Sequence, residues 1–341
     1  MSYVDNSITP PQWPHNPTTP LRPINWNRTQ DAKDNEVWQR LTANFWLPEK
    51  VPLSNDLPTW RTMTPVYREL VTRTFTGLTL LDTLQASVGE ISQIPDAHTE
   101  HEQAVYANIA FMQAVHARSY SSVFSTMCSS TEIDDAYTWA ISNPLLQRRA
   151  TRVIEHYYGS DPLKRKVAST LLSSLLLYAG FYLPLWLSTR GKLMNTADMI
   201  RLILRDKAVH GYYSGYKYQR GLELKPERAN EMAEFTYSLC DELLDMEKAY
   251  TADLYAPADQ ANALEGLTLD GVMSFVYYNA DKALMNLGYE PAYEEQAAHV
   301  SPEIIAALTP ESNETHDFFS GSGSAYIIGT AEETTEEDWD F

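Results

Sequence analysis

The stretch "RDKAVHGYY" (205–213) places Lys207 and His210 three residues apart, and a second stretch, "MQAVHARSY" (112–120), repeats this spacing with a glutamine and a histidine. Residues at i and i+3 share one face of an α-helix. Helix bundles that bind two metal ions carry a Glu-x-x-His pair on each of two helices. The sequence therefore predicts two facing helices whose glutamate positions hold an amide and a cation instead.

The residues around these two stretches favour helix. The middle of the chain is rich in Leu, Ala, Met, Glu, Arg and Gln and has few alternating β-branched runs, which is typical of helices. The predicted helices cover 32–43, 64–90, 99–128, 131–140, 145–158, 162–187, 195–221, 225–253 and 258–287. We predict an all-α fold, a bundle of long helices.

Proline and glycine mark the ends of this helical region. Ten of the 19 prolines fall within residues 1–65, and a Gly/Ser stretch followed by acidic residues closes the chain. Flexible linkers and acidic segments of this kind need not pack on their own domain. We predict an irregular N-terminal arm over 1–30, a helical domain over 31–290 and a flexible tail over 291–341.

Composition limits the partners and the compartment. The chain has 341 residues and a net charge of −19, which opposes binding to nucleic acid or an anionic membrane surface. Cys128 and Cys240 form no CxxC motif, so the sequence predicts neither a disulfide framework nor a zinc cluster and fits the cytoplasm. The N-terminus lacks the basic and apolar regions of a signal peptide.

One apolar segment is long enough to cross a bilayer. The 21 residues "VASTLLSSLLLYAGFYLPLWL" (167–187) contain no charge. They do contain several serines and Pro184, and a helix that is apolar all round also suits the centre of a large bundle. We therefore predict a buried core helix and no membrane span.

Polar residues on four of the predicted helices form the candidate site. Taken singly, each has a structural explanation, because buried polar groups are usually hydrogen-bonded core residues. The repeated x-x-His pattern on two helices, with an aspartate in the apolar stretch "GLTLLDTLQ", favours a shared function. The candidates are Asp82, Gln113, His116, Tyr120, Ser173, Lys207 and His210.

At these residues the chain resembles the beta, radical-carrying subunit of class I ribonucleotide reductases, closest to class Ib. The resemblance runs from "NWN" (25–27) and "TANFWLPEKVPLSND" (42–56) to the tail "HDFFSGSGSAYIIG" (316–329), through these stretches: "FTGLTLLDT", "HARSYSSVFSTMCS", "DPLKRKVASTLL" and "NTADMIRLILRD". It implies a ferritin-like helical bundle that dimerises. It also implies that the chain generates a radical for a separate alpha subunit, which reduces ribonucleotides to deoxyribonucleotides.

The metal ligands of that family are replaced here at three positions. The family's aspartate corresponds to Asp82 and its histidines to His116 and His210, whereas its three glutamates correspond to Gln113, Ser173 and Lys207. This combination resembles class Ie, a subgroup that assembles its radical without metal.

Charge counting supports the same interpretation. Four carboxylates would neutralise two divalent cations, but here Asp82 and Lys207 already cancel each other. Two divalent ions would leave about +4 uncompensated in a low-dielectric core. A protonated lysine has no lone pair and cannot bind a metal. We predict that Lys207 fills the former metal volume and pairs with Asp82, with Gln113 and Ser173 completing its hydrogen bonds.

The resemblance also implies how the radical forms without the oxidising power of a metal centre. In class Ie the tyrosine corresponding to Tyr120 is hydroxylated to dihydroxyphenylalanine, which carries the radical. A small flavodoxin-like activator supplies the oxidant through reduced oxygen species. No bound cofactor is expected.

Radical export is implied at the residues that match the family's transfer path. These are Trp46, Asp206 and His116, with Tyr326 in the tail bridging to the alpha subunit. The apolar residues of the tail suit a peptide that docks in a partner's groove.

Two other interpretations remain open from sequence. Asp82, His116 and His210 could hold a single transition metal as a facial triad, although Lys207 would then lie beside the cation. Alternatively, the chain is a non-catalytic paralogue that regulates the alpha subunit.

Overall fold

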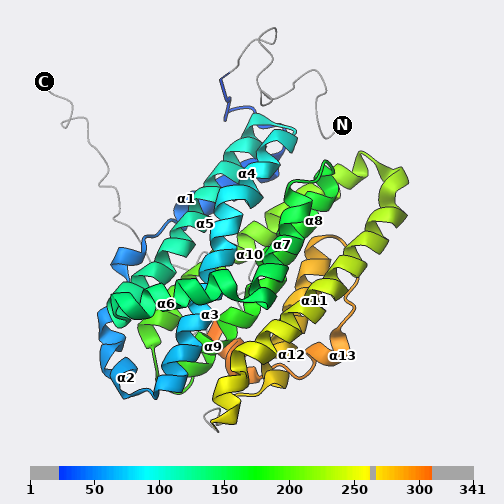
Figure 1. Ribbon diagram of the computed structural model, residues 1–341. Helices are drawn as coiled ribbons and strands as arrows, with labels where there is room; N and C mark the ends of the chain where they lie inside the picture. The colour runs from blue at the N-terminus through cyan, green and yellow to red at the C-terminus, as the bar shows by residue number, and fades with distance from the viewer. Residues whose placement is uncertain (1–22, 262–265, 309–341) are drawn as a thin grey trace, which may run out of the picture.

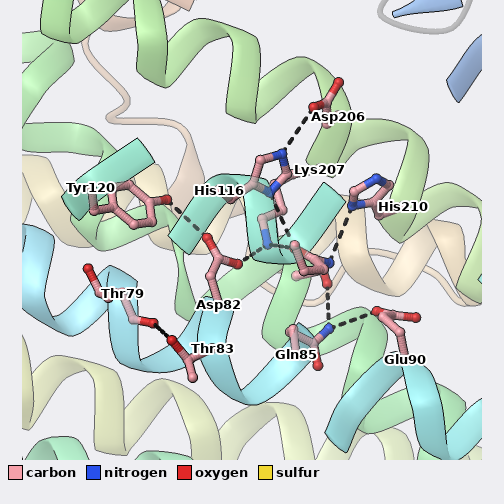
Figure 2. A network of polar contacts seen from close by, with 12 residues as sticks. Thr79, Asp82, Thr83, Gln85, Glu90, His116, Tyr120, Asp206, Lys207 and His210 are labelled. Atoms are coloured by element: carbon pink, nitrogen blue, oxygen red, sulfur yellow. Dashed lines mark hydrogen bonds and ion pairs between the residues drawn. The ribbon is translucent and has the colours of Figure 1, made fainter. Parts of the chain in front are cut away.

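The computed structural model describes residues 23–261 and 266–308 and shows a bundle of long helices (Figure 1). No strand occurs within these residues, which confirms the all-α prediction. The longest helices are α3 (Pro65–Leu84), α5 (Glu100–Met127), α10 (Met194–Glu223) and α11 (Ala229–Gln260). Side chains from α3, α5 and α10 meet in the interior, where the candidate site lies (Figure 2).

Shorter elements complete the bundle. The remaining α-helices are α1 (Ala32–Ala43), α2 (Leu57–Thr62), α4 (Glu90–Gln93), α6 (Ser130–Ser142), α7 (Pro144–Tyr157), α8 (Pro162–Leu171), α9 (Tyr178–Ser188), α12 (Leu269–Asn286), α13 (Glu294–Ala297) and α14 (Pro302–Leu308). Short 3-10 turns cover Pro48–Lys50, Leu53–Asp56, Ile94–Asp96 and Pro226–Arg228. Two π-helical turns cover Gln85–Gly89 and Leu172–Leu176.

Side-chain caps fix several of the predicted helix starts. The side chain of Thr99 caps α5 by accepting a hydrogen bond from the backbone amide of Glu102. The side chain of Asp161 caps α8 by accepting from the backbone amides of Leu163 and Lys164, and Pro162 is the first helical residue. Such caps satisfy backbone amides that have no partner within the helix. They explain why the predicted and observed starts of these two helices agree within one residue.

Two predicted helix starts are wrong. The helix predicted from 225 begins at Ala229, after a 3-10 turn that contains Pro226, and it continues to Gln260 with Pro257 inside it. The helix predicted from 258 begins at Leu269, where Thr268 caps it. The helical spacing of apolar residues did not reveal where these two helices begin.

The apolar segment forms the centre of the bundle, as predicted. Within the described residues, one helical stretch, Pro162–Ser188, is long and apolar enough to span a membrane, but 89% of its apolar 18-residue segment is buried inside the protein. It is not one regular helix, because a π-helical turn separates α8 from α9. π-turns occur often at functional sites.

The predicted boundary between body and tail at residue 290 is too early. Helices α13 and α14 lie beyond it, and Ile304 and Ala307 of α14 are buried in the core. The packed body therefore reaches Leu308. The rest of the predicted tail, including Tyr326, lies outside the described residues, as do residues 1–22 of the arm.

A buried cation fastens the N-terminal helix to the bundle. Lys217 of α10 is 1% exposed, and its Nζ lies 2.8 Å from Asp31, the N-cap of α1, and 2.5 Å from Asp34. At the other end of α1, Trp46 donates a hydrogen bond to Asp206 of the same helix α10. Helix α1 and the segment after it are thus held to α10 at two points.

We expect Lys217→Met to destabilise the protein by about 3–5 kcal/mol, because it leaves two buried carboxylates without their cation. Urea unfolding followed by circular dichroism measures the loss. The control is Lys33→Met, which removes the partly exposed pair with Glu36 and should change stability by less than about 1 kcal/mol. Equal losses in the two variants would contradict the assignment.

Candidate functional site

The centre of the site is a buried ion pair between Lys207 of α10 and Asp82 of α3. Both side chains are 0% exposed, and the ammonium donates to the Oδ1 atom of Asp82 and to the Oε1 atom of Gln113 on α5. Figure 2 shows the ammonium between Asp82 and His116. The predicted pairing of Lys207 with Asp82 and Gln113 is therefore present.

Tyr120 of α5 lies on the other side of this aspartate. Its hydroxyl donates to Oδ2 of Asp82 at 3.0 Å, and its ring stacks on Phe75 with centroids 5.9 Å apart. The side chain is fully buried. Burial and the neighbouring carboxylate raise the pKa of Tyr120 well above its ordinary value, so the phenol is protonated and has one adjacent proton acceptor.

On the far side of Lys207, hydrogen bonds continue to Trp46. Oε1 of Gln113 lies 3.3 Å from Nδ1 of His116, and Nε2 of His116 lies 3.0 Å from Oδ2 of Asp206. The same Oδ2 accepts from the indole nitrogen of Trp46 at 2.7 Å. Together with the contacts of Lys207 and Tyr120, these bonds form a continuous chain, here called the relay. Its members are Tyr120, Asp82, Lys207, Gln113, His116, Asp206 and Trp46.

His116 and Asp206 share a hydrogen bond in the middle of the relay. A carbonyl oxygen only accepts, so Nδ1 of His116 carries a hydrogen toward Gln113. Burial and the Lys207 cation lower the pKa of His116 to about 3, while burial raises that of Asp206. Burial therefore favours a neutral His116, whose Nε2 shares a hydrogen bond with Oδ2 of Asp206.

His210 and Ser173 are in the same region with different partners. Nδ1 of His210 lies 3.3 Å from Nε2 of Gln113, so the glutamine connects both histidines. Ser173 was predicted to bond with Lys207, but its hydroxyl accepts from Nε2 of Gln85 at 3.0 Å. That prediction is wrong because a serine side chain is short and ends nearer to Gln85 than to the ammonium.

The sequence analysis did not predict a second group of buried polar residues, which contacts Ser173 through Gln85. Glu90 accepts hydrogen bonds from Gln85 at 3.0 Å, from Gln93 at 2.9 Å and from Ser169 at 3.2 Å. All four side chains are 0% exposed. The hydroxyl of Tyr157 donates to Oε1 of Gln85. We call Gln85, Glu90, Gln93 and Ser169 the amide cluster.

The π-helical turn explains why this cluster was not predicted. In a regular α-helix, residues five apart do not share a face. The turn Gln85–Gly89 has i→i+5 geometry and brings Gln85 and Glu90 together. A polar residue at each of 82, 85, 90 and 93 in an apolar segment was the available signal.

The donor set does not fit a pair of divalent metal ions. Within the described residues, no three His, Cys, Asp or Glu side chains are grouped so that they could hold a metal. The ammonium of Lys207 lies within hydrogen-bonding distance of Asp82 and Gln113, two positions that the resemblance aligns with metal ligands. A metal ion there would meet a cation with no lone pair to offer.

Comparison with known proteins establishes the family. The sequence model of the family described as ribonucleotide reductase, small chain, matches residues 23–302 of this chain. The chain belongs to this family. It is 61% identical over 319 residues to the ribonucleoside-diphosphate reductase subunit beta of Mycobacterium leprae, covering 93% of this chain and 96% of the relative. The Escherichia coli ribonucleoside-diphosphate reductase 2 subunit beta is 57% identical over 93% of this chain and 98% of its own length.

A solved structure in the same family has the same fold. The dimanganese(II)-NrdF of Streptococcus sanguinis superimposes with a TM-score of 0.80 at 41% identity, over 85% of this chain and all of the other. The chain is accordingly the beta subunit of a ribonucleoside-diphosphate reductase, an oxidoreductase with the ferritin-like fold that the resemblance implied.

The buried carboxyl of Glu90 yields a prediction about stability and pH. Burial raises the pKa of Glu90 from 4.5 to about 7, so its protonated form is favoured in the folded state. The stabilisation is present at low pH and is lost as the pH rises through about 7. We expect Glu90→Gln to gain roughly 2 kcal/mol relative to the wild type between about pH 5.5 and pH 8.

Urea unfolding at the two pH values tests this expectation. The exposed Glu295 gives a matched control, because Glu295→Gln should follow the wild type at both values. A difference between Glu90→Gln and wild type that does not change with pH would show that Glu90 titrates normally.

Proposed function

We propose that this beta subunit stores a metal-free radical on a hydroxylated Tyr120, as dihydroxyphenylalanine, and passes it to an alpha subunit. The observation that carries the proposal is the Lys207 ammonium, bonded to Asp82 and Gln113 between Tyr120 and His116. A lysine in that position replaces the charge that metal ions would supply, so the oxidising equivalent must be stored on the aromatic ring.

The relay supports a role in transfer without metal. Oxidation of a phenol releases its proton, and Asp82 already accepts the hydrogen bond from Tyr120 at 3.0 Å. Lys207 balances the carboxylate before that proton arrives. From Lys207 the bonds continue through Gln113 and His116 to Asp206 and Trp46, so no member of the path depends on a bound metal ion.

Hydroxylation of Tyr120 needs an external oxidant. With a peroxide, one ring C–H bond and the O–O bond break, a C–OH bond forms, and water leaves. Storage of the radical then takes one further electron from the ring, which a second reduced oxygen species accepts, and the phenol proton moves to Asp82, the nearest acceptor. The second hydroxyl makes the ring easier to oxidise, and complete burial of Tyr120 keeps reductants away.

The proposal includes the partners implied by the family. The chain forms a homodimer in the cytoplasm and works with an alpha subunit, which its C-terminal tail contacts through Tyr326. A flavodoxin-like protein supplies the reduced oxygen species. The charge of −19 supports protein partners over nucleic acid.

A metal-dependent subunit with a single-metal site at Asp82, His116 and His210 is the second candidate. A relative that is a dimanganese(II) protein supports a metal cofactor, although that protein is named for two ions. The geometry opposes it in this chain. Each oxygen of Asp82 already accepts a hydrogen bond, and the ring nitrogens of His116 face Gln113 and Asp206.

A non-catalytic regulatory paralogue is the third candidate. Such a chain would have no need of an unbroken path between Tyr120 and Trp46. The complete relay therefore favours the catalytic proposal.

We expect an active preparation to contain a peptide around Tyr120 that is heavier by one oxygen atom and less than stoichiometric iron or manganese. Expression in iron- and manganese-rich medium with the activator, followed by mass spectrometry and metal analysis, measures both. Tyr120→Phe is the control and should show neither the added oxygen nor deoxynucleotide formation. Stoichiometric metal with an unmodified Tyr120 in active protein would refute the proposal.

We expect Trp46→Phe to retain the radical and lose its export, because phenylalanine fills most of the indole volume but cannot donate to Asp206. Electron paramagnetic resonance measures the radical after activation, and deoxynucleotide formation with the alpha subunit should fall by at least about tenfold. Trp139→Phe, at a partly buried tryptophan outside the relay, serves as the control. Normal turnover by Trp46→Phe would exclude this tryptophan from the path.

A further inference from the structure

Tyr213 of α10 is a fully buried tyrosine whose contacts repeat those of Tyr120. Its hydroxyl donates to Oδ1 of Asp34 on α1 at 2.8 Å, and the same oxygen pairs with the ammonium of Lys217 at 2.5 Å. At the candidate site, Tyr120 and a lysine likewise share one aspartate, Asp82 (Figure 2). The protein therefore repeats a buried group of one tyrosine, one aspartate and one lysine, and the relay does not include the second copy.

The carboxyl group of Asp34 accepts hydrogen bonds on both oxygens. Tyr213 and Lys217 reach Oδ1, and the hydroxyl of Thr99 donates to Oδ2 at 3.0 Å. Thr99 already accepts from the backbone amide of Glu102, so its own hydrogen is left for Asp34. Burial raises the pKa of Asp34 and the Lys217 cation opposes that rise. An acidic proton on either oxygen would meet one of these donors, so the ionised carboxylate fits the contacts.

The charges around this aspartate favour removal of an electron from the nearby ring. The ammonium of Lys217 lies 2.8 Å from Asp31 and 3.7 Å from Glu102. Lys166 lies 3.7 Å from the other oxygen of Glu102. With Asp34, this cluster holds three carboxylates and two ammonium groups, an excess of one negative charge. Oxidation of a neighbouring ring adds one positive charge, which that excess balances in a medium of low dielectric.

Tyr213 lies on the side of the site opposite Tyr120. The ring of Tyr106 on α5 meets the ring of Tyr213 edge-on, with centroids 5.3 Å apart. Tyr106, Gln113 and Tyr120 follow one another at intervals of seven residues and share one face of α5. With a rise of 1.5 Å per residue, the two tyrosines of α5 lie about 10 Å to either side of Gln113 along the helix. Tyr213 itself lies one turn beyond His210 on α10.

We propose that Tyr213 is a second redox-active tyrosine, which gives an electron to a one-electron oxidant and its phenol proton to Asp34. The oxidant belongs to the class of reduced oxygen species, such as superoxide. The O–H bond of Tyr213 breaks, and the proton stays on Oδ1 of Asp34. The electron reduces superoxide, which leaves as hydrogen peroxide after taking two protons from water. The ring then holds a neutral, buried radical.

This activity protects the protein and does not drive nucleotide reduction. Because the relay does not include Tyr213, a radical there is not exported through Trp46. It collects oxidising equivalents that do not end on Tyr120 and keeps them from exposed side chains. The inference does not rest on the proposed hydroxylation of Tyr120.

Tyr157 is the matched control, because it is equally enclosed but has a different acceptor. Its side chain is 2% exposed, and its hydroxyl donates to Oε1 of Gln85. An amide oxygen accepts a hydrogen bond but is not a base near neutral pH. Oxidation of Tyr157 therefore has no adjacent group to take the phenol proton, whereas a base within hydrogen-bonding distance assists such a step.

Photo-oxidation of the Tyr120→Phe protein tests the proposal without any activator. Flash-generated tris(bipyridine)ruthenium(III) supplies the one-electron oxidant, and electron paramagnetic resonance of rapidly frozen samples detects the radical. With 3-fluorotyrosine in place of Tyr213, which keeps the hydroxyl, we expect a ¹⁹F splitting in the signal. The same label in place of Tyr157 should give no splitting. A signal without ¹⁹F splitting from the label at 213 would overturn the proposal.

Two further variants in the Tyr120→Phe protein test the ring and its base separately. Tyr213→Phe and Asp34→Asn should each lower the radical yield at least about tenfold, because one removes the phenol and the other its proton acceptor. Asp34→Asn leaves two carboxylates and two ammonium groups in the cluster, so its charges still balance. Tyr157→Phe should leave the yield unchanged. Equal yields in all these proteins would refute the assignment.

The outcome is independent of the proposed function. A wild type that forms no dihydroxyphenylalanine would defeat the proposed storage of a radical on Tyr120. It would leave the test of Tyr213 unaffected, because every protein in that test carries Tyr120→Phe.

Discussion

The ion pair of Lys207 and Asp82 is the constraint on which the site depends. Removing two charges from water costs several kcal/mol per ion, and close pairing with additional hydrogen bonds offsets that cost. Here both oxygens of Asp82 are used, one by Lys207 and one by Tyr120, and the ammonium has a second acceptor in Gln113. A neutral, hydrogen-bonded interior can therefore exist in the same fold as the dimanganese(II)-NrdF of Streptococcus sanguinis.

Once the ammonium occupies the centre, the polarity of the surrounding groups follows from their donors and acceptors. Lys207 requires oxygen atoms around it, which turns Gln113 so that its nitrogen faces His210 and its oxygen faces His116. Because Nδ1 of His116 faces the oxygen of Gln113, the other ring nitrogen, Nε2, faces Asp206. The order of donors from Trp46 to Tyr120 is thus determined by one positive charge. Buried networks of this kind are costly when one member is missing.

Much of the fold and part of the site were predictable from sequence because they depend on local features. Helix α1 was predicted over 32–43 and found at Ala32–Ala43, and α5 was predicted within one residue at each end, where Thr99 supplies a side-chain cap. Glu90 was not predicted because a π-turn changes which residues share a face. Ser173 was assigned the wrong partner, since its short side chain reaches Gln85 and not the ammonium.

The sequence by itself determined the helical class, the positions of most helices, and the presence of an amide, a hydroxyl and a cation at positions 113, 173 and 207. These are properties of residue type and of spacing along one helix. The tertiary structure alone decided that the cation meets Asp82, that hydrogen bonds run unbroken from Tyr120 to Trp46, and that Glu90 is surrounded by polar side chains of the amide cluster. Those facts depend on how α3, α5 and α10 pack and on the two π-turns, because a side chain's partners on other helices cannot be read from its own helical period.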